Sequence, residues 1–400
     1  MEPELFVRIE RTTTTDLLSL VPSELLCWIG PDRKLVGWGE ALKIEFVGNH
    51  AIRDAARRWD DLVDHCVLTD LANSELARSA PIALASFGFA AHTPGYLIVP
   101  KVLLVQEGDE TLIITASTEG PAESAPELTR HEFSTPQGLW TDPGRMTQSQ
   151  WLTAVRRLTN LLQAGAASKV VLTRDIVVSA ATEIDERFLV QRLTELYPTT
   201  WVYAVAGLVG ATPEMLAAMN GTSVVSRVLA GTSAPGQGQE LLDSLKNRSE
   251  HHFAVESVAR ALAPRAEKLN VPTEPKLLDL PNVTHLATDV TAEIKDANVL
   301  DIVDALHPTA AVCGTPTKLA FDILEDLEGT QRGRYSGPVG WIDASGSGEF
   351  GIALRCGQIE GNSIRVFAGG GIMPDSIPEV ELAETRAKMR PVLEALGLED

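Results

Sequence analysis

The feature that most constrains the fold is the order of the strand-like segments, which come in adjacent pairs rather than in alternation with helices. Near the end of the chain the apolar runs PVGWID, FGIALRC and IRVFAG follow one another across short glycine-rich stretches. Strands joined by tight turns pair antiparallel, whereas parallel strands need a long crossover connection. The sequence therefore predicts an α+β fold, one large domain with large, mostly antiparallel sheets flanked by helices.

Other segments fit the same plan. Strand-like runs are LLCWIG, KIEFVG and YLIVPKVLLVQ in the first third of the chain, then KVVLTRDIVV and WVYAVAGLVG, the last expected as one buried strand. Helix-like patterns of apolar residues cover residues 51–65, 148–164, 184–196, 246–263 and 378–396.

The chain has 400 residues, more than the roughly 250–300 at which single cores usually stop growing. Its clearest change in composition is residues 117–143, which are rich in Pro, Glu, Ser and Thr and are typical of a surface loop or linker. The length therefore allows two domains or one large sheet-based domain with insertions.

The formal net charge of −20 argues against nucleic acid and anionic membrane as partners. The N-terminal residues MEPELFVRIERT do not resemble a signal peptide, and His92, Pro94 and Gly95 interrupt the most apolar window. The four cysteines show no paired spacing, which predicts free thiols in a reducing compartment. We expect a soluble cytoplasmic protein and, without a coiled-coil pattern or a large apolar face, a monomer.

Two glycine patterns could bind phosphates or other anions. Residues 346–351 match GxGxxG, but a strand pattern follows where a dinucleotide site needs a helix, so a hairpin turn is the simpler interpretation. Residues 369–371 are three consecutive glycines. They could let backbone N–H groups approach an anion, or could form a loop that needs positive φ, and the local sequence leaves both open.

Several charged residues could carry chemistry, each with an ordinary structural alternative. Glu381, Glu384 and Lys388 share one helix stripe, which is commonly a solvated face with a salt bridge. Lys169 begins an apolar strand and could lie at the surface, and Glu214 follows a buried strand and could cap a helix.

A metal site is a further possibility. Glu250 precedes two adjacent histidines, which point to different faces of a helix and do not match a zinc motif. Carboxylates from two separate helices suit a hard cation better, with Mg²⁺ the natural candidate. No GxSxG elbow supports serine-nucleophile chemistry.

From about residue 148 to the C-terminus the chain resembles the chorismate-utilising enzymes, which include isochorismate synthases, salicylate synthases and anthranilate synthase component I. The resemblance implies that residues 1–145 form a variable N-terminal part of the same fold and residues 146–400 its catalytic core. The matching segments occur in the family's order: SKVVLTR (168–174), GATPEML (210–216), LAGT (229–232), KNRSEHH (246–252), HLATDV (285–290), LHPTAAVCGTP (306–316), RYSGPVGWID (334–343), GEFGIALRC (348–356), AGGGI (368–372) and ELAETRAK (381–388).

The resemblance implies a role for each candidate residue. Lys169 resembles the general base that activates water to attack C2 of the chorismate ring, and Glu214 the general acid that protonates the leaving C4 hydroxyl. It also implies that the lysine is buried and lies near positive charge or a metal. Glu250 and Glu384 match ligands of Mg²⁺, with Glu381 acting through a water. The implied substrate-binding residues are Gly231, His285, Ala311, Val312, Tyr335, Arg355, Gly369 and Lys388.

Within the family, Lys169 indicates water rather than ammonia as the nucleophile, and the segment His307-Pro308-Thr309 resembles isochorismate synthases. The resemblance thus implies Mg²⁺-dependent conversion of chorismate to isochorismate, for siderophore, menaquinone or another pathway. A salicylate synthase, which also eliminates pyruvate, and an inactive chorismate-binding homologue are the alternatives. The sequence departs from the family pattern at Ala310, at residues 233–236 and at Cys313.

Overall fold

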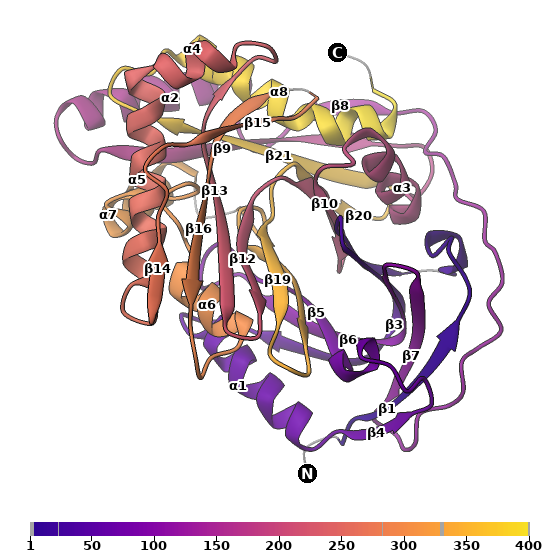
Figure 1. Cartoon of the computed structure of the whole chain (residues 1–400). Coiled ribbons are helices and arrows are strands. Elements are labelled where there is room, and N and C mark those ends of the chain that lie inside the picture. Colours follow the sequence, from indigo (N-terminus) through magenta and orange to yellow (C-terminus); the bar gives the residue numbers. More distant parts are fainter. Residues whose placement is uncertain (1–3, 23, 282, 329–331, 399–400) are drawn as a thin grey trace.

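A computed structural model describes residues 4–22, 24–281, 283–328 and 332–398 (Figure 1). The described strands join in one hydrogen-bonded network. They are β1 (Phe6–Thr12), β2 (Leu25–Ile29), β3 (Arg33–Phe46), β4 (Val67–Asp70), β5 (Ile82–Ser86), β6 (Gly95–Glu107), β7 (Glu110–Ser117), β8 (Trp140–Pro143), β9 (Lys169–Ser179), β10 (Trp201–Val205), β11 (Leu208–Thr212), β12 (Met215–Asn220), β13 (Ser223–Ser233), β14 (Lys268–Asn270), β15 (Lys276–Asp279), β16 (Thr284–Glu293), β17 (Gly314–Thr315), β18 (Pro338–Asp343), β19 (Gly348–Ile352), β20 (Cys356–Glu360) and β21 (Ser363–Ile372).

The helices lie on the outer faces of these strands. They are α1 (Ala51–Asp64), α2 (Gln148–Gln163), α3 (Glu186–Leu196), α4 (Gly238–Asp243), α5 (Leu245–Leu262), α6 (Val299–Leu306), α7 (Thr317–Glu328) and α8 (Pro378–Leu396). In Figure 1, α5 lies along β13 and β16, and α8 crosses the top of the molecule over β21 and β9. None of the helices in the described ranges is long and apolar enough to cross a membrane.

The predicted α+β class is confirmed. Of the pairings between described strands, β1 with β4 is parallel and the others are antiparallel. The GxGxxG segment begins in the turn of the β18–β19 hairpin and continues into β19, so a strand follows the turn as expected. All four cysteines are free thiols, also as expected. The division at residue 145 stays a prediction.

Two expected strands are wrong in detail. The run WVYAVAGLVG forms the hairpin β10–β11, which turns at Ala206 and Gly207 with φ of 50° and 79°. The run FGIALRC is also split, because β19 ends at Ile352 and β20 begins at Cys356. The break matters for function, because it places Arg355 in a turn with φ of 49°.

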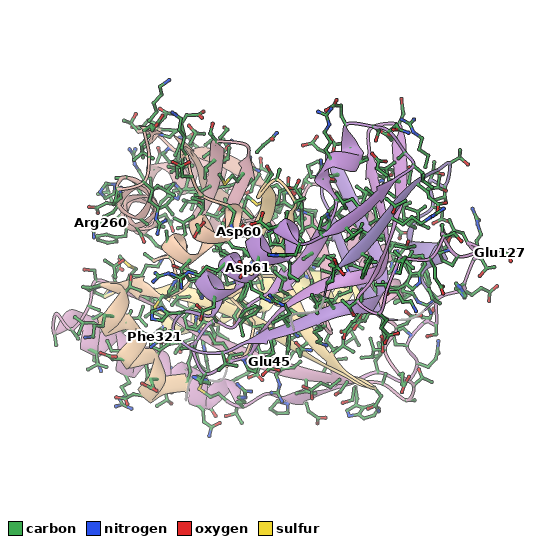
Figure 2. All side chains as sticks on the ribbon, turned by 90° about the horizontal axis from the view of Figure 1, so that it is seen from below. Glu45, Asp60, Asp61, Glu127, Arg260 and Phe321 are labelled. Carbon is green, nitrogen blue, oxygen red and sulfur yellow. The ribbon has the colours of Figure 1, made fainter. Side chains whose placement is uncertain are left out.

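Asn298 fixes the start of α6, whose C-terminal continuation leads to Ala311 and Val312. Its side chain accepts hydrogen bonds from the N–H groups of Leu300 (2.9 Å) and Asp301 (3.2 Å). Its amide nitrogen donates to Asp60 of α1 at 3.0 Å, and Figure 2 labels Asp60 beside Asp61 on that helix. This side chain therefore both caps α6 and joins it to α1.

We expect Asn298→Ala to lower the free energy of unfolding by about 1–2 kcal/mol, because an N-cap and a partly buried hydrogen bond are lost together. Urea denaturation of the purified variant would measure it. Asn270→Ala removes an exposed amide with one 3.4 Å hydrogen bond and serves as the control. Equal stability of the two variants would contradict this role for the cap.

Candidate active site

Lys169 is buried at the start of β9, with 1% of its surface exposed. Its strand is held on both sides, by β21 and by β17, so the side chain emerges inside the fold. The Nζ atom lies 3.0 Å from Oε1 of Glu250, on α5. The surface alternative is therefore wrong. The group in contact with this ammonium is a carboxylate, whereas the family resemblance led us to expect positive neighbours or a metal.

The three glycines at 369–371 lie within β21, and none of them has a positive φ. The alternative of a positive-φ loop is therefore wrong. A Cβ atom at Gly371 would overlap Oε1 of Glu250 and lie 2.6 Å from Cε of Lys169. Glycine is needed here because the lysine–glutamate pair packs directly against the strand backbone.

Gly371→Ala is expected to displace the Lys169–Glu250 pair and to lower turnover of the enzyme's substrate by about 100-fold, since small misplacements of catalytic groups cost rate factors of that order. The melting temperature should change little if the two side chains can swing aside. Steady-state kinetics and thermal denaturation of the same preparation would separate the effects. Unchanged kinetics would show that the close packing at Gly371 is not needed for catalysis.

Glu214 lies in the turn between β11 and β12 and is 4% exposed. The N-cap alternative is wrong, because a strand follows it. Burial raises the pKa of this carboxyl to about 7, although the Leu229 N–H and the charges of Lys169 and Arg355 act in the opposite direction. The Leu229 nitrogen lies 3.5 Å from Oε1. A large fraction of Glu214 is therefore protonated at neutral pH.

Arg355 and His285 form a buried pair. Nη2 of Arg355 lies 2.8 Å from Nε2 of His285, and Nδ1 of the histidine lies 3.2 Å from the Gly231 carbonyl. Burial, and then the charge of Arg355, hold the pKa of His285 well below its usual range, so the ring is neutral. Because the guanidinium can only donate, Nε2 accepts and the proton is on Nδ1.

Arg355 has a donor to spare. Its Nε atom is buried and has no hydrogen-bond partner within the described ranges.

Tyr335, 3% exposed, is stacked on Phe367 with ring centroids 5.1 Å apart. Its hydroxyl would lie 3.5 Å from a Cβ built on Gly369. A fixed guanidinium beside a fixed phenol is suited to holding a carboxylate.

The carboxylate stripe of α8 faces β21 rather than solvent. Glu381 is 3% exposed and accepts a hydrogen bond from Ser376 at 2.6 Å. Glu384 pairs with Lys388, whose Nζ also donates to the Gly369 carbonyl at 3.0 Å. The salt bridge expected on this helix is present, but the expectation that its charged stripe faces solvent is wrong.

The donor set fits Mg²⁺ in kind. A Cβ at Gly370 would lie 3.3 Å from Oε2 of Glu381 and 3.8 Å from Oε1 of Glu384, while Glu250 faces the adjacent Gly371. Carboxylates from α5 and α8 thus approach neighbouring positions of the glycine run in β21, and carboxylate oxygens are the donors that Mg²⁺ prefers. Among the described residues no three acidic, histidine or cysteine side chains are close enough to hold an ion as they stand.

One narrow cavity brings most of the predicted residues together. The space in it that no atom fills is about 550 Å³, open solvent included. Its lining contains all eight predicted substrate-binding residues together with Glu214 and Glu250. Lys169 contacts it through Glu250, whereas Glu381 and Glu384 lie outside the lining. Gly371, of the glycine run noted in the sequence, also lines it, and the lining residues that we did not single out are Val171, Pro213, Leu229, Ala230, Thr232, Ser336 and Leu354. All of them lie within the segments that carry the family resemblance, which was the available signal.

The geometry agrees with comparisons to known proteins. The family described as "Chorismate binding enzyme" matches residues 24–397. The chain belongs to the chorismate-binding enzymes. It is 31% identical to the vibriobactin-specific isochorismate synthase of Vibrio cholerae, over 80% of each chain. It is 35% identical to MenF of Mycobacterium tuberculosis, over 80% of this chain and 88% of that protein.

The fold of this chorismate-binding enzyme is also that of a solved relative. The crystal structure of DhbC from Bacillus anthracis is 28% identical in sequence and superposes with a TM-score of 0.80, covering 96% of this chain and 99% of that one. Because 96% of this chain is covered, the match includes most of the first 145 residues, which our motif-based resemblance did not reach. The N-terminal strands thus belong to the same fold as the cavity.

Proposed function

We propose that this chorismate-binding enzyme is an isochorismate synthase, which converts chorismate to isochorismate by adding water at C2 and removing the C4 hydroxyl. The proposal is carried by one cavity that presents a protonatable buried carboxyl and a guanidinium donor without a partner among the described residues. A buried lysine contacts its lining residue Glu250. A base, an acid and an anion-binding group are what this exchange of hydroxyl positions requires.

In the proposed reaction Lys169, in its neutral form, takes a proton from water as the oxygen bonds to C2. The ring double bonds shift, and Glu214 donates its proton to the departing C4 oxygen, so water enters and water leaves. Because burial raises the pKa of Glu214 to about 7, this carboxyl can still carry the proton that it donates near neutral pH.

The remaining residues would bind and orient the substrate. Arg355 and Tyr335 would hold the enolpyruvyl carboxylate, and the neutral His285 fixes the orientation of the guanidinium. Backbone N–H groups near Gly231 and Gly369, with Lys388, would complete the anion site, and Ala311 and Val312 would contact the ring. Glu250 and Glu384 would bind Mg²⁺ directly and Glu381 through water. When bound, the ion would offset the charge of the ring carboxylate.

The test is to incubate purified protein with chorismate, with Mg²⁺ or with excess chelator, and to separate the products by chromatography. We expect isochorismate, no salicylate and no pyruvate, and no turnover in chelator. Salicylate with pyruvate would instead identify a salicylate synthase. Binding of chorismate without any product would identify an inactive homologue.

A further inference from the structure

A second pocket lies on another side of α8 and is lined by arginines. We call it the arginine pocket. It is formed by residues 141–148, β9 and α8, and about 1880 Å³ of it is not filled by atoms, open solvent included. Its lining residues Ala383, Arg386 and Arg390 follow a different stripe of α8 from the one that carries Glu381, Glu384 and Lys388. The pocket is therefore separate from the catalytic cavity.

Arg174 of β9 places a buried charge at this pocket, and no carboxylate of the described residues forms an ion pair with it. It is 5% exposed, and its Nη1 atom lies 3.3 Å from Oγ1 of Thr385 and 3.9 Å from Sδ of Met389. Its Nε atom has no hydrogen-bond partner in the part of the chain that the structure describes. A buried guanidinium with only neutral partners is costly unless an anion joins it.

The nearest carboxylate in the sequence does not supply that anion. Asp175 follows Arg174 on a strand, where successive side chains point to opposite faces. It pairs with Arg365 and accepts a hydrogen bond from the backbone N–H of Arg145 at 3.0 Å. Asp175 is thus engaged with other partners.

More positive charge surrounds the same pocket. Nη2 of Arg386 donates to the neutral side chain of Gln148 at 2.9 Å, and Arg390 pairs with Glu394 at 2.6 Å. Burial lowers the pKa of Arg174, the charge of Arg386 lowers it further, and the charge of Asp175 acts in the opposite direction. Thr147 and Gln148 bring the N-terminus of α2 to the lining, and its helix dipole favours anions. This cluster stands out in a chain of net charge −20.

The rest of the lining holds one carboxylate, Asp142, which accepts a hydrogen bond from Trp140 at 3.1 Å, and several apolar residues. The pocket includes the side chains of Met146, Ile176, Ala383, Met389 and Leu393. Inorganic anions gain nothing from such walls, whereas an aromatic ring packs well against methionine sulfur and guanidinium planes. The complementary ligand is therefore an anion with an apolar body.

We propose that the arginine pocket binds a small aromatic carboxylate, held by Arg174, Arg386 and Arg390. Such a ligand would bridge β9, which begins with Lys169, and α8, which carries Glu384 and Lys388. The proposal concerns binding alone and does not rest on the proposed function.

Isothermal titration of the full chain with benzoate, and separately with inorganic phosphate, tests it. We expect saturable benzoate binding, at least about tenfold weaker in Arg386→Gln/Arg390→Gln, because one charge-assisted hydrogen bond is worth more than the 1.4 kcal/mol of a tenfold change. Arg174→Met should weaken it similarly. If Arg174→Met does not fold, the affinity of Arg386→Gln/Arg390→Gln, whose changed residues are exposed, still tests the proposal.

The control is Arg57→Gln/Arg260→Gln, which removes two exposed charges elsewhere and should bind benzoate like the wild type. Figure 2 labels Arg260 at the outer edge of the molecule. Equal affinity of wild type and Arg386→Gln/Arg390→Gln would place benzoate at another site and overturn the proposal. So would the absence of benzoate binding at millimolar concentration, or phosphate binding as tightly as benzoate.

Discussion

Replacing Lys169 by alanine is expected to lower turnover of chorismate by about 1,000-fold or more, while the protein still folds. General base catalysis contributes roughly 10²- to 10⁴-fold, and an alanine has no group that can take the proton of the attacking water. The variant also leaves Glu250 without its partner at 3.0 Å, so some loss of stability should accompany the loss of rate. Product chromatography and circular dichroism of the same sample would measure both.

Lys169→Gln separates catalysis from positioning. The glutamine amide can still donate a hydrogen bond to Glu250, but it cannot act as a base near neutrality. We expect it to restore stability relative to Lys169→Ala and to remain nearly inactive. Lys276→Gln, which removes an exposed lysine paired with Asp289, is the matched control and should keep full activity. If Lys169→Gln turned over chorismate at a rate near that of the wild type, Lys169 would be a positioning residue and the base would lie elsewhere.

The helix that the sequence predicted at about 378–396 agrees with α8, and both of its ends carry strong local signals. Pro378 occupies the first turn and Gly397 ends the helix with φ of 84°. The run at 201–210 carried no such signal. Both of its strands are almost entirely buried, so no alternation showed where one ended, and the turn uses Ala206 in a conformation that alanine rarely adopts.

In the site, too, local sequence signals predicted part of what the structure shows, and contacts between distant segments determined the rest. The motif order pointed to the residues, but each taken alone had an ordinary alternative. Burial of Lys169 depends on Glu250, which is far away in sequence, and on the missing side chain at Gly371. The unpaired Nε of Arg355 depends on a strand break that the apolar pattern of FGIALRC concealed. Such features arise only when α5, β9 and β21 have been packed together.

Glu214→Gln is expected to lower kcat by about 10²- to 10⁴-fold, because glutamine keeps the shape of the protonated carboxyl but cannot give its proton to the leaving oxygen. The pH dependence identifies the role. As a proton donor, Glu214 acts while protonated, so wild-type kcat/KM should fall as the pH rises through about 7. Whatever activity the variant retains should lack this decline. A variant with the wild-type rate and the same decline would exclude Glu214 as the acid.

The free energy of unfolding should also depend on whether Glu214 is protonated. The folded-state pKa of Glu214, about 7, lies above its ordinary value of 4.5, so its stabilising contribution is complete below pH 4.5 and is lost as the pH rises through about 7. Glu214→Gln removes this loss and should be more stable than the wild type above pH 7. Glu186 provides a matched control, since burial raises its pKa to about 7 as well and it lies outside the catalytic cavity. Glu186→Gln should show the same gain in stability at high pH with unchanged turnover, which separates the chemistry of Glu214 from the general effect of neutralising a buried carboxyl.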